Sequence, residues 1–276
     1  MASERSGAGD PDRTLELLWR LPAGQRRGPR PGLSLDTLVD AATGLADAQG
    51  LPALTMRRLA QPVGVAPMTL YTYVPGKAEL LDLVIDAAYA RMLRADTAGR
   101  PWRERVTVVA EENRALLAAH PWLAAVSTSR PPLGPGQMAK YEHELRALDG
   151  LGLPDVDLDA ALAHLLAFVR AHARDATDAL AAQRESRMDD EQWWKVNAPL
   201  LARVLDESAY PTAVRVGTAA GQVHAAAWNA DHAWSFGLRL LIDGLAASAN
   251  PTGHAERAGA GDRRERRSGA AGTAAR

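Results

Sequence analysis

Apolar side chains recur at the three- and four-residue spacing of helices over almost the whole chain. Between residues 34 and 50 one helical face is apolar, and it is formed by Leu35, Leu38, Val39, Ala42, Leu45 and Ala46. The alternation of apolar and polar positions that marks a half-buried strand does not persist anywhere. The pattern therefore predicts an all-α protein.

The first third of the chain predicts short helices. A short amphipathic helix at 14–21 precedes a Pro-, Gly- and Arg-rich stretch at 22–32, which is too poor in large apolar residues to pack. Three short helices follow between residues 34 and 74, and a longer fourth helix begins at Lys77.

Capping residues and a turn mark the borders of the three short helices. Ser34 and Thr55 can each accept a hydrogen bond at a helix N-terminus. Gly64 supplies the turn between the second and third helices. Pro67 suits the first turn of the third helix, which is expected to run to about Tyr73.

The predicted helices lengthen beyond residue 99. They are expected at 102–119, 137–149, 157–184, 190–207 and from about 221 to 248. The last residues, 250–276, are mostly Gly, Ala, Arg and Glu with few large apolar side chains, so they are predicted to be disordered.

Composition narrows the class of protein. The 276 residues are 47% hydrophobic and include no Cys, which excludes disulfides, thiolate zinc sites and a cysteine nucleophile. No apolar run approaches the roughly 18 residues of a membrane span, and the N-terminus lacks the apolar core of a signal peptide. Only three of the 32 basic residues are Lys, and Ala is abundant, which suggests a GC-rich bacterial source. We expect a cytoplasmic, nucleoid-associated protein with no membrane partner, no metal and no cofactor.

Charge is unevenly distributed. Residues 26–78 carry three more positive than negative charges, whereas 79–250 carry six more negative ones. Such asymmetry can mark a polyanion-binding segment joined to an acidic body, although ordinary solvated surfaces also produce an excess of three.

The second and third short helices, joined at Gly64, have the outline of a helix-turn-helix, whose second helix can enter a DNA major groove. On that helix Leu70 and Val74 can pack inward. The outward or flanking positions are then Thr69, Tyr71, Thr72 and Tyr73. Hydroxyl groups can bond to phosphate oxygens, and a Thr methyl or Pro ring can touch a thymine methyl. The alternative is that the tyrosines are half-buried packing residues.

The segment "ALTMRRLAQPVGVAPMTLYTYVPGKAELLDLVID" at 53–86 resembles the DNA-binding segment of tetracycline-repressor-type (TetR-type) transcriptional regulators. The likeness covers about 33–90, and "FGLRLLIDGL" at 236–245 is similar to the final helix of the branch nearest the tetracycline repressor. The resemblance implies an all-helical homodimer with an effector pocket in its C-terminal domain.

The same resemblance implies roles for single residues. Arg57 matches a position that reaches bases, and Thr55 matches one that caps the second helix and can touch phosphate. The base-facing start of the recognition helix corresponds to Pro67, Met68 and Thr69, and the phosphate contacts correspond to Tyr71 and Lys77.

Three positions depart from the family pattern. Thr72 and Tyr73, also candidate DNA contacts, stand where larger basic or aromatic groups and His are frequent. Pro62 falls in the last turn of the second helix, where it removes an N–H donor and can clash with the carbonyl of Arg58. We therefore expect the second helix to end early. In the stretch before the domain, Arg26, Arg27 and Arg30 form either a minor-groove arm or a simple linker.

Aromatic and His side chains punctuate the larger Ala- and Leu-rich region. The candidate ligand-binding residues are His120, Trp122, His164, Phe168, His172 and Trp193. They suit a planar, partly apolar molecule with His as a polar handle, and the alternative is a stripe of core residues. No HExxH motif indicates a metal.

The last helix carries small and large apolar residues at helical repeats, namely Gly237, Leu238, Leu241, Gly244 and Leu245. Close helix approach at such a face suits a two-fold dimer interface. The alternative is packing within one chain.

These readings divide the chain into four parts. An N-terminal extension with a short helix and basic arm occupies 1–32, a helix-turn-helix domain occupies 33–93 with its motif at about 55–74, and an effector-binding and dimerisation domain of the helical-bundle type occupies 94–249 before the tail at 250–276.

The sequence favours a homodimeric DNA-binding repressor that a small lipophilic effector releases from a double-stranded palindromic operator. Two alternatives stay open. One is a helical enzyme using His172 with Asp175 or His120, and the other is a DNA-binding protein that needs no ligand.

Overall fold

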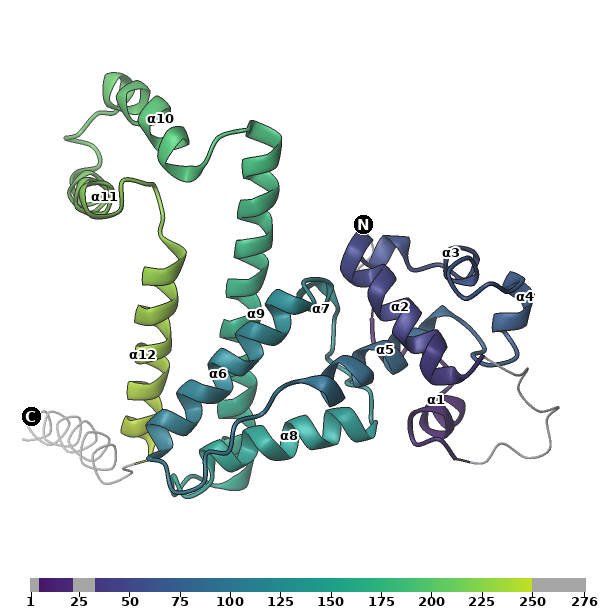
Figure 1. Cartoon of the computed structure of the whole chain (residues 1–276). Coiled ribbons are helices and arrows are strands. Elements are labelled where there is room, and N and C mark those ends of the chain that lie inside the picture. The colour runs from purple at the N-terminus through teal and green to yellow at the C-terminus, as the bar shows by residue number, and fades with distance from the viewer. Residues whose placement is uncertain (1–4, 22–32, 250–276) are drawn as a thin grey trace, which may run out of the picture.

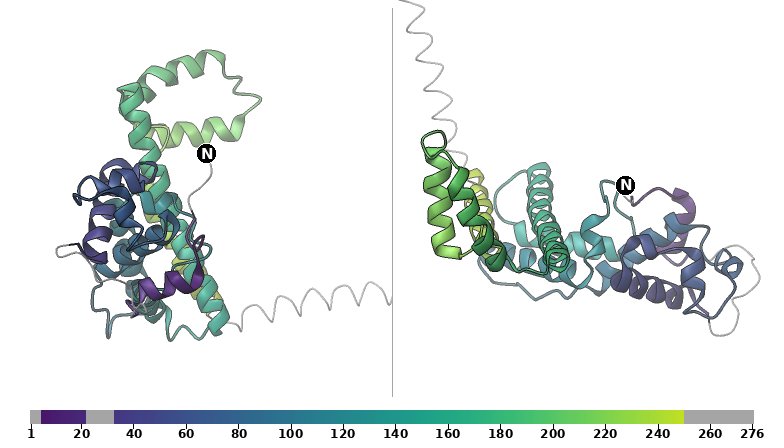
Figure 2. Two further views of the ribbon diagram at one scale, coloured as in Figure 1. Left: turned by 90° about the vertical axis from the view of Figure 1, so that its right-hand side faces the viewer. Right: turned by 90° about the horizontal axis from the view of Figure 1, so that it is seen from above.

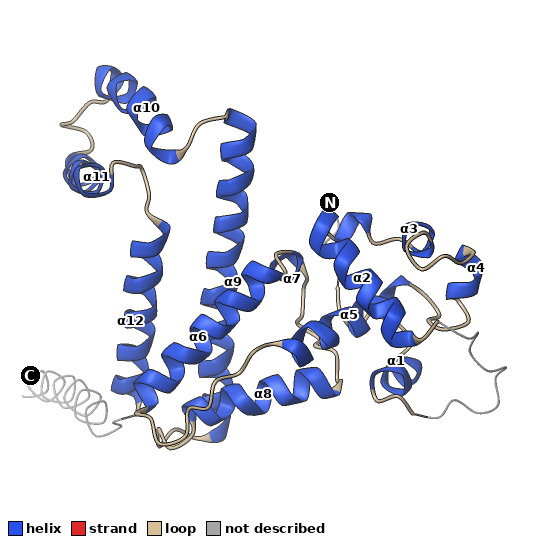
Figure 3. Ribbon diagram, in the orientation of Figure 1, coloured by secondary structure: helices blue, strands red, loops and turns tan. Residues whose placement is uncertain are grey.

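The computed structural model describes residues 5–21 and 33–249. Within these ranges the regular elements are helices, and the one bridge between extended residues, Arg5 with Ser127, is isolated (Figure 3). The all-α prediction is therefore confirmed. The predicted basic arm at 22–32 and the predicted tail at 250–276 lie outside the described residues.

The first helices gather at one end of the molecule (Figure 1). They are α1 (Pro11–Leu18), α2 (Leu35–Gln49), the 3-10 turn η1 (Leu51–Ala53), α3 (Met56–Ala60), α4 (Pro67–Leu70) and α5 (Lys77–Arg91). Ser34 and Thr55 cap α2 and α3 as predicted, because their hydroxyl oxygens accept hydrogen bonds from the amides of Thr37 and Arg58. The helices share one core, in which Leu38, Leu54, Leu59, Leu70 and Ile85 are fully buried.

The expected early end of the second helix of the motif is confirmed. Helix α3 stops at Ala60, so Pro62 lies in the turn and its missing N–H disturbs no helical ladder. Gly64 takes the left-handed conformation, with φ of 66°, which favours glycine. The amide of Val65 then donates to the carbonyl of Ala60 at 3.1 Å and closes the turn.

The remaining helices form the larger part of the molecule (Figure 1). They are α6 (Trp102–Ala119), α7 (Trp122–Ala125), α8 (Pro135–Leu148), α9 (Asp155–Ser186), α10 (Asp190–Val204), α11 (Pro211–His224) and α12 (Ala230–Ser248). A second core joins α6, α8, α9 and α12 and includes Val106, Leu148, Leu165, Trp234 and Leu238.

The prediction of one last helix from about 221 to 248 is wrong. Helix α11 ends at His224, since Ala225 takes a left-handed conformation and its amide bonds to the carbonyl of Gly221 at 2.9 Å. Asn229 then starts α12, because its side chain accepts a hydrogen bond from the amide of His232. The apolar spacing hid this break, and the capping Asn was its one local signal.

Helices α10 and α11 lie side by side as a hairpin at the end of the molecule opposite the first helices (Figure 2). Neither helix contains a buried residue.

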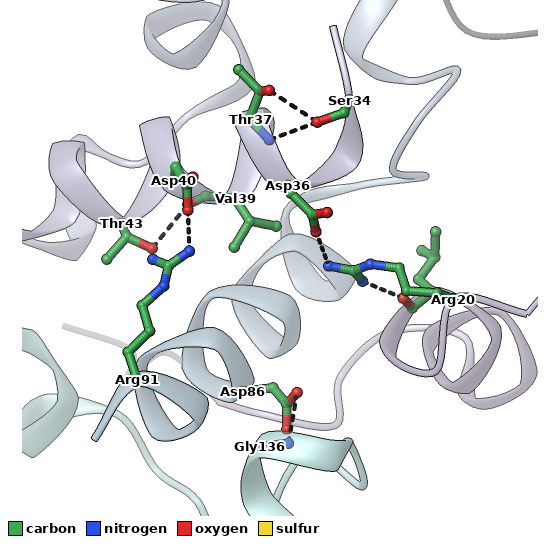
Figure 4. Close-up of polar contacts among 11 residues, drawn as sticks. Arg20, Ser34, Asp36, Thr37, Val39, Asp40, Thr43, Asp86, Arg91 and Gly136 are labelled. Atoms are coloured by element: carbon green, nitrogen blue, oxygen red, sulfur yellow. Dashed lines mark hydrogen bonds and ion pairs between the residues drawn. The ribbon is translucent and has the colours of Figure 1, made fainter. Parts of the chain in front are cut away.

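Helix α5 connects the two ends. Its Arg91 pairs with Asp40 of α2, and its Asp86 accepts hydrogen bonds from the first amides of α8 (Figure 4). The distances from Asp86 oxygens to the nitrogens of Gly136 and Gln137 are 3.2 and 2.8 Å. A carboxylate at a helix N-terminus stabilises that helix, so α8 is fixed directly to α5, the helix that follows the helix-turn-helix.

Candidate nucleic-acid interface and effector domain

Helix α4 places its polar and apolar residues as the sequence predicted. Leu70 and Val74 are fully buried, whereas Pro67, Met68 and Tyr71 are exposed. The Met68 side chain, 74% exposed, is a large apolar group left in solvent. An exposed apolar face on a recognition helix can contact thymine methyl groups in a major groove.

The two hydroxyl-bearing residues after α4 differ. The Thr72 hydroxyl donates to the carbonyl of Thr69 at 2.7 Å, so its one donor hydrogen is used inside the turn. The Tyr71 hydroxyl has no hydrogen-bond partner among the described residues. Tyr73 is half-buried and packs against the core, which agrees with the packing alternative for this ring.

Helix α3 exposes two arginines, Arg57 and Arg58, whose contacts within the chain differ. Arg58 is bound to Gln49 at the end of α2. Arg57 and Thr55 are exposed, and Arg57 has no ion-pair partner among residues 5–21 and 33–249. Lys77 stands at the first position of α5, where free helical amides attract anions.

His120 and Trp122 meet at the junction between the two ends of the molecule. One oxygen of Asp47 on α2 lies 2.7 Å from Nδ1 of His120 and 2.6 Å from Nε1 of Trp122. Trp122 is buried there in the first core. These two residues therefore connect α2 to α7 and lie apart from the other candidate ligand residues.

Phe168 and His172 belong to an aromatic cluster at the crossing of α6, α9 and α12. Their ring centroids lie 5.2 and 5.0 Å from that of Trp234, and the Phe168 ring stacks on it. The Trp234 indole N–H donates to Glu111 at 2.7 Å. Burial, and secondarily the nearby Arg114, lower the pKa of His172 below its ordinary value. The sequence pattern did not single out Trp234, because it indicated a dimer interface on the helix that carries this residue.

His164 lies elsewhere on α9. It lines an open groove of about 770 Å³ between α9 and α12, together with the predicted dimer residues Leu241, Gly244 and Leu245. Trp193 is exposed on α10. The six candidate ligand residues are thus divided among the junction, the aromatic cluster, this groove and α10.

Gly237 and Gly244 have different surroundings. A Cβ atom at Gly237 would lie 2.5 Å from the Phe168 ring, whereas one at Gly244 would meet nothing within 4 Å. Gly237 therefore serves packing inside the chain, the alternative that the sequence left open, and Leu238 is also buried. Gly244 remains available to a second molecule.

A buried polar group between α6 and α8 was not anticipated. Glu144 accepts hydrogen bonds from Lys140 at 2.5 Å and from Asn113 at 2.6 Å. The Lys140 ammonium lies 5.2 Å from the ring centroid of Tyr89 on α5. Desolvation by burial lowers the pKa of Lys140, with Glu144 opposing that change. In the part of the chain that the structure describes, His, Asp and Glu form no group of three that could hold a metal ion.

A helix-turn-helix at one end, joined by α5 to a larger helical domain, defines a DNA-binding transcriptional regulator. Residues 38–84 match the family described as bacterial regulatory proteins, tetR family. Residues 96–249 match the tetracyclin repressor-like C-terminal domain. The chain belongs to the TetR family.

The relatives agree with this assignment. The HTH-type transcriptional repressor DrrR1 of Streptomyces coeruleorubidus is 39% identical over 245 residues, which is 88% of each chain. The structure of ActR from Streptomyces coelicolor in complex with actinorhodin is 29% identical, covers 80% of this chain and 99% of that one, and has a TM-score of 0.68. The complex of ActR with (S)-DNPA is 30% identical with a TM-score of 0.64. No helix among the described residues is both long and apolar enough to cross a bilayer.

Proposed function

We propose that this regulator is a homodimeric repressor that binds a palindromic operator and is released from it by a small lipophilic, aromatic effector in the bacterial cytoplasm, at the nucleoid. The observation that carries the DNA-binding surface is the shared exposure of Arg57 on α3 and of Pro67, Met68 and Tyr71 on α4.

The contacts divide by chemistry. Arg57 and the start of α4, with Thr69, read base edges. Thr55, Tyr71 and Lys77 hold phosphates, and the α5 N-terminus adds its free amides to the Lys77 contact. The basic arm with Arg26, Arg27 and Arg30 supplies further backbone attraction from outside the described residues.

The dimer is formed through α9, α10 and α12. The groove of about 770 Å³ between α9 and α12 is lined by Leu240, Leu241 and Leu245. On α10 the exposed large apolar residues are Trp193, Val196, Leu200, Leu201 and Val204. Contiguous exposed apolar surface of this kind marks a protein interface, and the two-fold axis of the dimer matches the symmetry of a palindromic site.

The effector binds in the larger domain next to the aromatic cluster of Phe168, His172 and Trp234. The rings offer stacking surface, and burial keeps His172 neutral, so that it can donate or accept a hydrogen bond. The structures of ActR in complex with actinorhodin and with (S)-DNPA support a small-molecule effector.

The test begins with selection of a binding site from random duplexes. Titrations on the selected and a scrambled duplex should show that Arg57→Ala costs about 1–3 kcal/mol on the selected site only. Lys77→Ala should weaken both duplexes alike and lower the salt slope by about 1 per contact. The reverse assignment would show that the motif enters the groove differently.

The effector experiment repeats these titrations with actinorhodin, with (S)-DNPA and with a series of lipophilic aromatic compounds. A roughly 5–150-fold loss of DNA affinity is expected for a true effector. Binding of every such compound without change in DNA affinity would favour the ligand-independent DNA-binding protein.

A further inference from the structure

Residues 5–21, called here the N-terminal strap, bind the helix-turn-helix domain through two buried acids of α5. Glu79 and Asp82 are 7% and 1% exposed. Glu79 accepts a hydrogen bond from the amide of Asp10 at 3.0 Å. Asp82 accepts one from the Ser6 hydroxyl at 2.5 Å and from the amide of Gly7 at 3.1 and 3.2 Å. Buried carboxylates require such partners, so the strap and α5 complete one another.

Helix α1 of the strap adds apolar contact to the same domain. It packs on α5, and its Leu17 and Leu18 are buried in the first core. Near the end of the strap, Arg20 pairs with Asp36 of α2 at 2.5 Å (Figure 4). The strap is therefore attached to two helices of the helix-turn-helix domain.

The strap also binds the loop between α7 and α8, which belongs to the larger domain. The amide of Ser6 donates to the carbonyl of Ser127 at 3.1 Å, next to the bridge between Arg5 and Ser127. The Trp19 indole N–H donates to the carbonyl of Leu133 at 2.8 Å. The strap thus connects the two domains at two points of this loop.

The acids of α5 show how the strap adds to the direct contact between the domains. Glu79, Asp82 and Asp86 stand three and four residues apart, so they share one face of the helix. Asp86 binds the first amides of α8, whereas Glu79 and Asp82 bind the strap. A further contact between the domains, from Asp47 to α7, uses a single carboxylate oxygen and does not involve α5.

Domains joined by limited contacts move relative to one another unless something opposes the motion. The contact of Asp86 with α8 lets α5 turn about that point. An attachment one and two helical turns away along the same face opposes this rotation, and the strap provides it.

We propose that the N-terminal strap determines the angle between the helix-turn-helix domain and the larger domain, and thereby the half-site spacing that the dimer accepts. The second part rests on the proposed homodimeric repressor. In such a dimer the larger domains hold the two α4 helices apart, so a fixed angle fixes their separation. Half-sites lie about 34–36 Å apart per helical turn, so two added base pairs displace one of them by about 7 Å. The strap precedes both parts of the chain that match the TetR family, 38–84 and 96–249.

Gly7→Val should detach the strap without a change inside either domain. The φ of Gly7 is 70°, and a Cβ atom there would lie 3.1 Å from the Cβ atom of Arg130. A β-branched residue avoids this backbone conformation, so the neighbouring bonds to Asp82 and Ser127 should be lost. The matched control is Gly150→Val, because Gly150 has a φ of 83° in the turn after α8 and a Cβ atom there would meet nothing within 4 Å.

Two further variants bracket this change. Ser6→Ala removes only the hydroxyl that bonds to Asp82, and its control is Ser127→Ala, whose hydroxyl lies near that of Ser129 and whose carbonyl still accepts from the strap. A chain lacking residues 2–9 removes the bonds of Ser6 and Gly7 whatever valine does, and it keeps α1 and its buried leucines.

The first measurement is the distance between the domains in the absence of DNA. The chain contains no Cys, so Gln61→Cys and Thr177→Cys, at exposed positions of the helix-turn-helix and of α9, carry two spin labels at defined sites. Labelled chains are diluted with unlabelled ones, so that pulsed electron paramagnetic resonance reports distances within one chain. The distribution should broaden or shift in Gly7→Val and in the shortened chain, less in Ser6→Ala, and remain as in wild type in both controls.

The second measurement uses the operator obtained by selection, the same operator with two base pairs inserted at its centre, and a single half-site. The preference of wild type for the selected spacing should fall at least about 5-fold in Gly7→Val and in the shortened chain, the lower limit of typical coupling between sites. Affinity for the single half-site should be unchanged, because the strap does not contribute to the surface of α3 and α4.

An unchanged distance distribution in both Gly7→Val and the shortened chain would overturn the proposal. A changed distribution with an unchanged spacing preference would overturn its second part. If selection yields no palindromic operator, the proposed repressor is contradicted, and the distances measured without DNA still decide whether the strap fixes the angle.

Discussion

Helices α5 and α10 have the same length, 15 residues, but opposite surroundings. Ten residues of α5 are buried, including the acids Glu79, Asp82 and Asp86, whereas α10 buries none. Most of α5 is covered by its own chain, because α1, α2 and α8 all pack on it. On α10 the apolar residues remain in solvent. The DNA-binding end is thus covered within one chain, whereas the far end leaves apolar surface open to the second molecule of the proposed dimer.

The sharpest test of this contrast places charge on the uncovered helix. The double change Leu200→Asp and Val204→Asp should leave the monomer folded but separate the dimer, because it buries two carboxylates in an apolar interface. Loss of the linked second half-site should lower operator affinity by about 10²–10⁴-fold. Sedimentation and DNA titration measure both effects.

The control for that change is Leu93→Asp, at a leucine that is 88% exposed in the linker after α5. It makes the same chemical change outside the proposed interface, so this variant should remain dimeric. A dimer of wild-type DNA affinity in the α10 double variant would show that α10 is uncovered for another reason.

The second prediction compares two glycines, one at each kind of surface. A Cβ atom at Gly136 would lie 2.0 Å from the carbonyl oxygen of Asp86, so α8 must move away from α5 in Gly136→Ala. We expect a loss of about 3 kcal/mol in the free energy of unfolding, at the upper end for overpacking. Within one chain Gly244 stands in open space inside α12, so Gly244→Ala should instead stabilise by up to about 1 kcal/mol when it is measured in the monomeric α10 double variant.

Urea unfolding of both variants measures these changes in the free energy of unfolding. Equal and small effects would mean that the contact between α5 and α8 is loose, and the contrast with the far end of the molecule would then fail.

The sequence predicted α5 and the helix-turn-helix because their signals are local: caps, a turn glycine and an apolar face. The acids of α5 gave no such signal, since their partners Ser6 and Asp10 lie 76 and 69 residues away. The contact of Gly237 with Phe168 was equally hidden, and helical spacing alone could not separate an internal face from a dimer face. The candidate ligand residues were scattered for the same reason: residue type indicates chemistry but does not place helices in space.

The third prediction concerns pH and uses one carboxyl from each region. Burial raises the pKa of Asp82 above its ordinary 3.8, although bonds from Ser6 and Gly7 oppose the change. The Asp82 carboxyl therefore binds its proton more tightly in the folded state than in the unfolded state. The resulting stabilisation is complete below about pH 3.8 and is lost as the pH rises through the raised pKa. Relative to wild type, Asp82→Asn should gain stability over that rise.

Asp206, in the loop between α10 and α11, should behave in the opposite way. Bonds from the hydroxyl and amide of Ser208 lower its pKa, so its contribution is present above pH 3.8 and is lost as the pH falls through the lowered pKa. Above pH 3.8 Asp206→Asn should be less stable than wild type, and this difference in the free energy of unfolding should disappear as the pH falls. Urea titrations at several pH values from about 3 to 7 measure both differences, and slopes of the same sign would contradict the assigned environments.

The smallest expected effect is a change in DNA affinity, and it concerns two hydroxyl groups at the end of α4. Tyr71 and Thr72 are adjacent, exposed and hydroxyl-bearing, yet the Thr72 hydrogen already bonds to the carbonyl of Thr69. A phosphate oxygen only accepts hydrogen bonds, so a hydroxyl must donate to it. Tyr71→Phe should therefore weaken DNA binding by about 0.5–1.5 kcal/mol for each protomer. Thr72→Val should change DNA binding little, because the donor it removes was not available.

Titration of both variants on the selected and scrambled duplexes should show the Tyr71 loss on each, as expected for a backbone contact. A larger loss for Thr72→Val would mean that its hydroxyl leaves Thr69 when DNA binds and that the end of α4 rearranges on the operator.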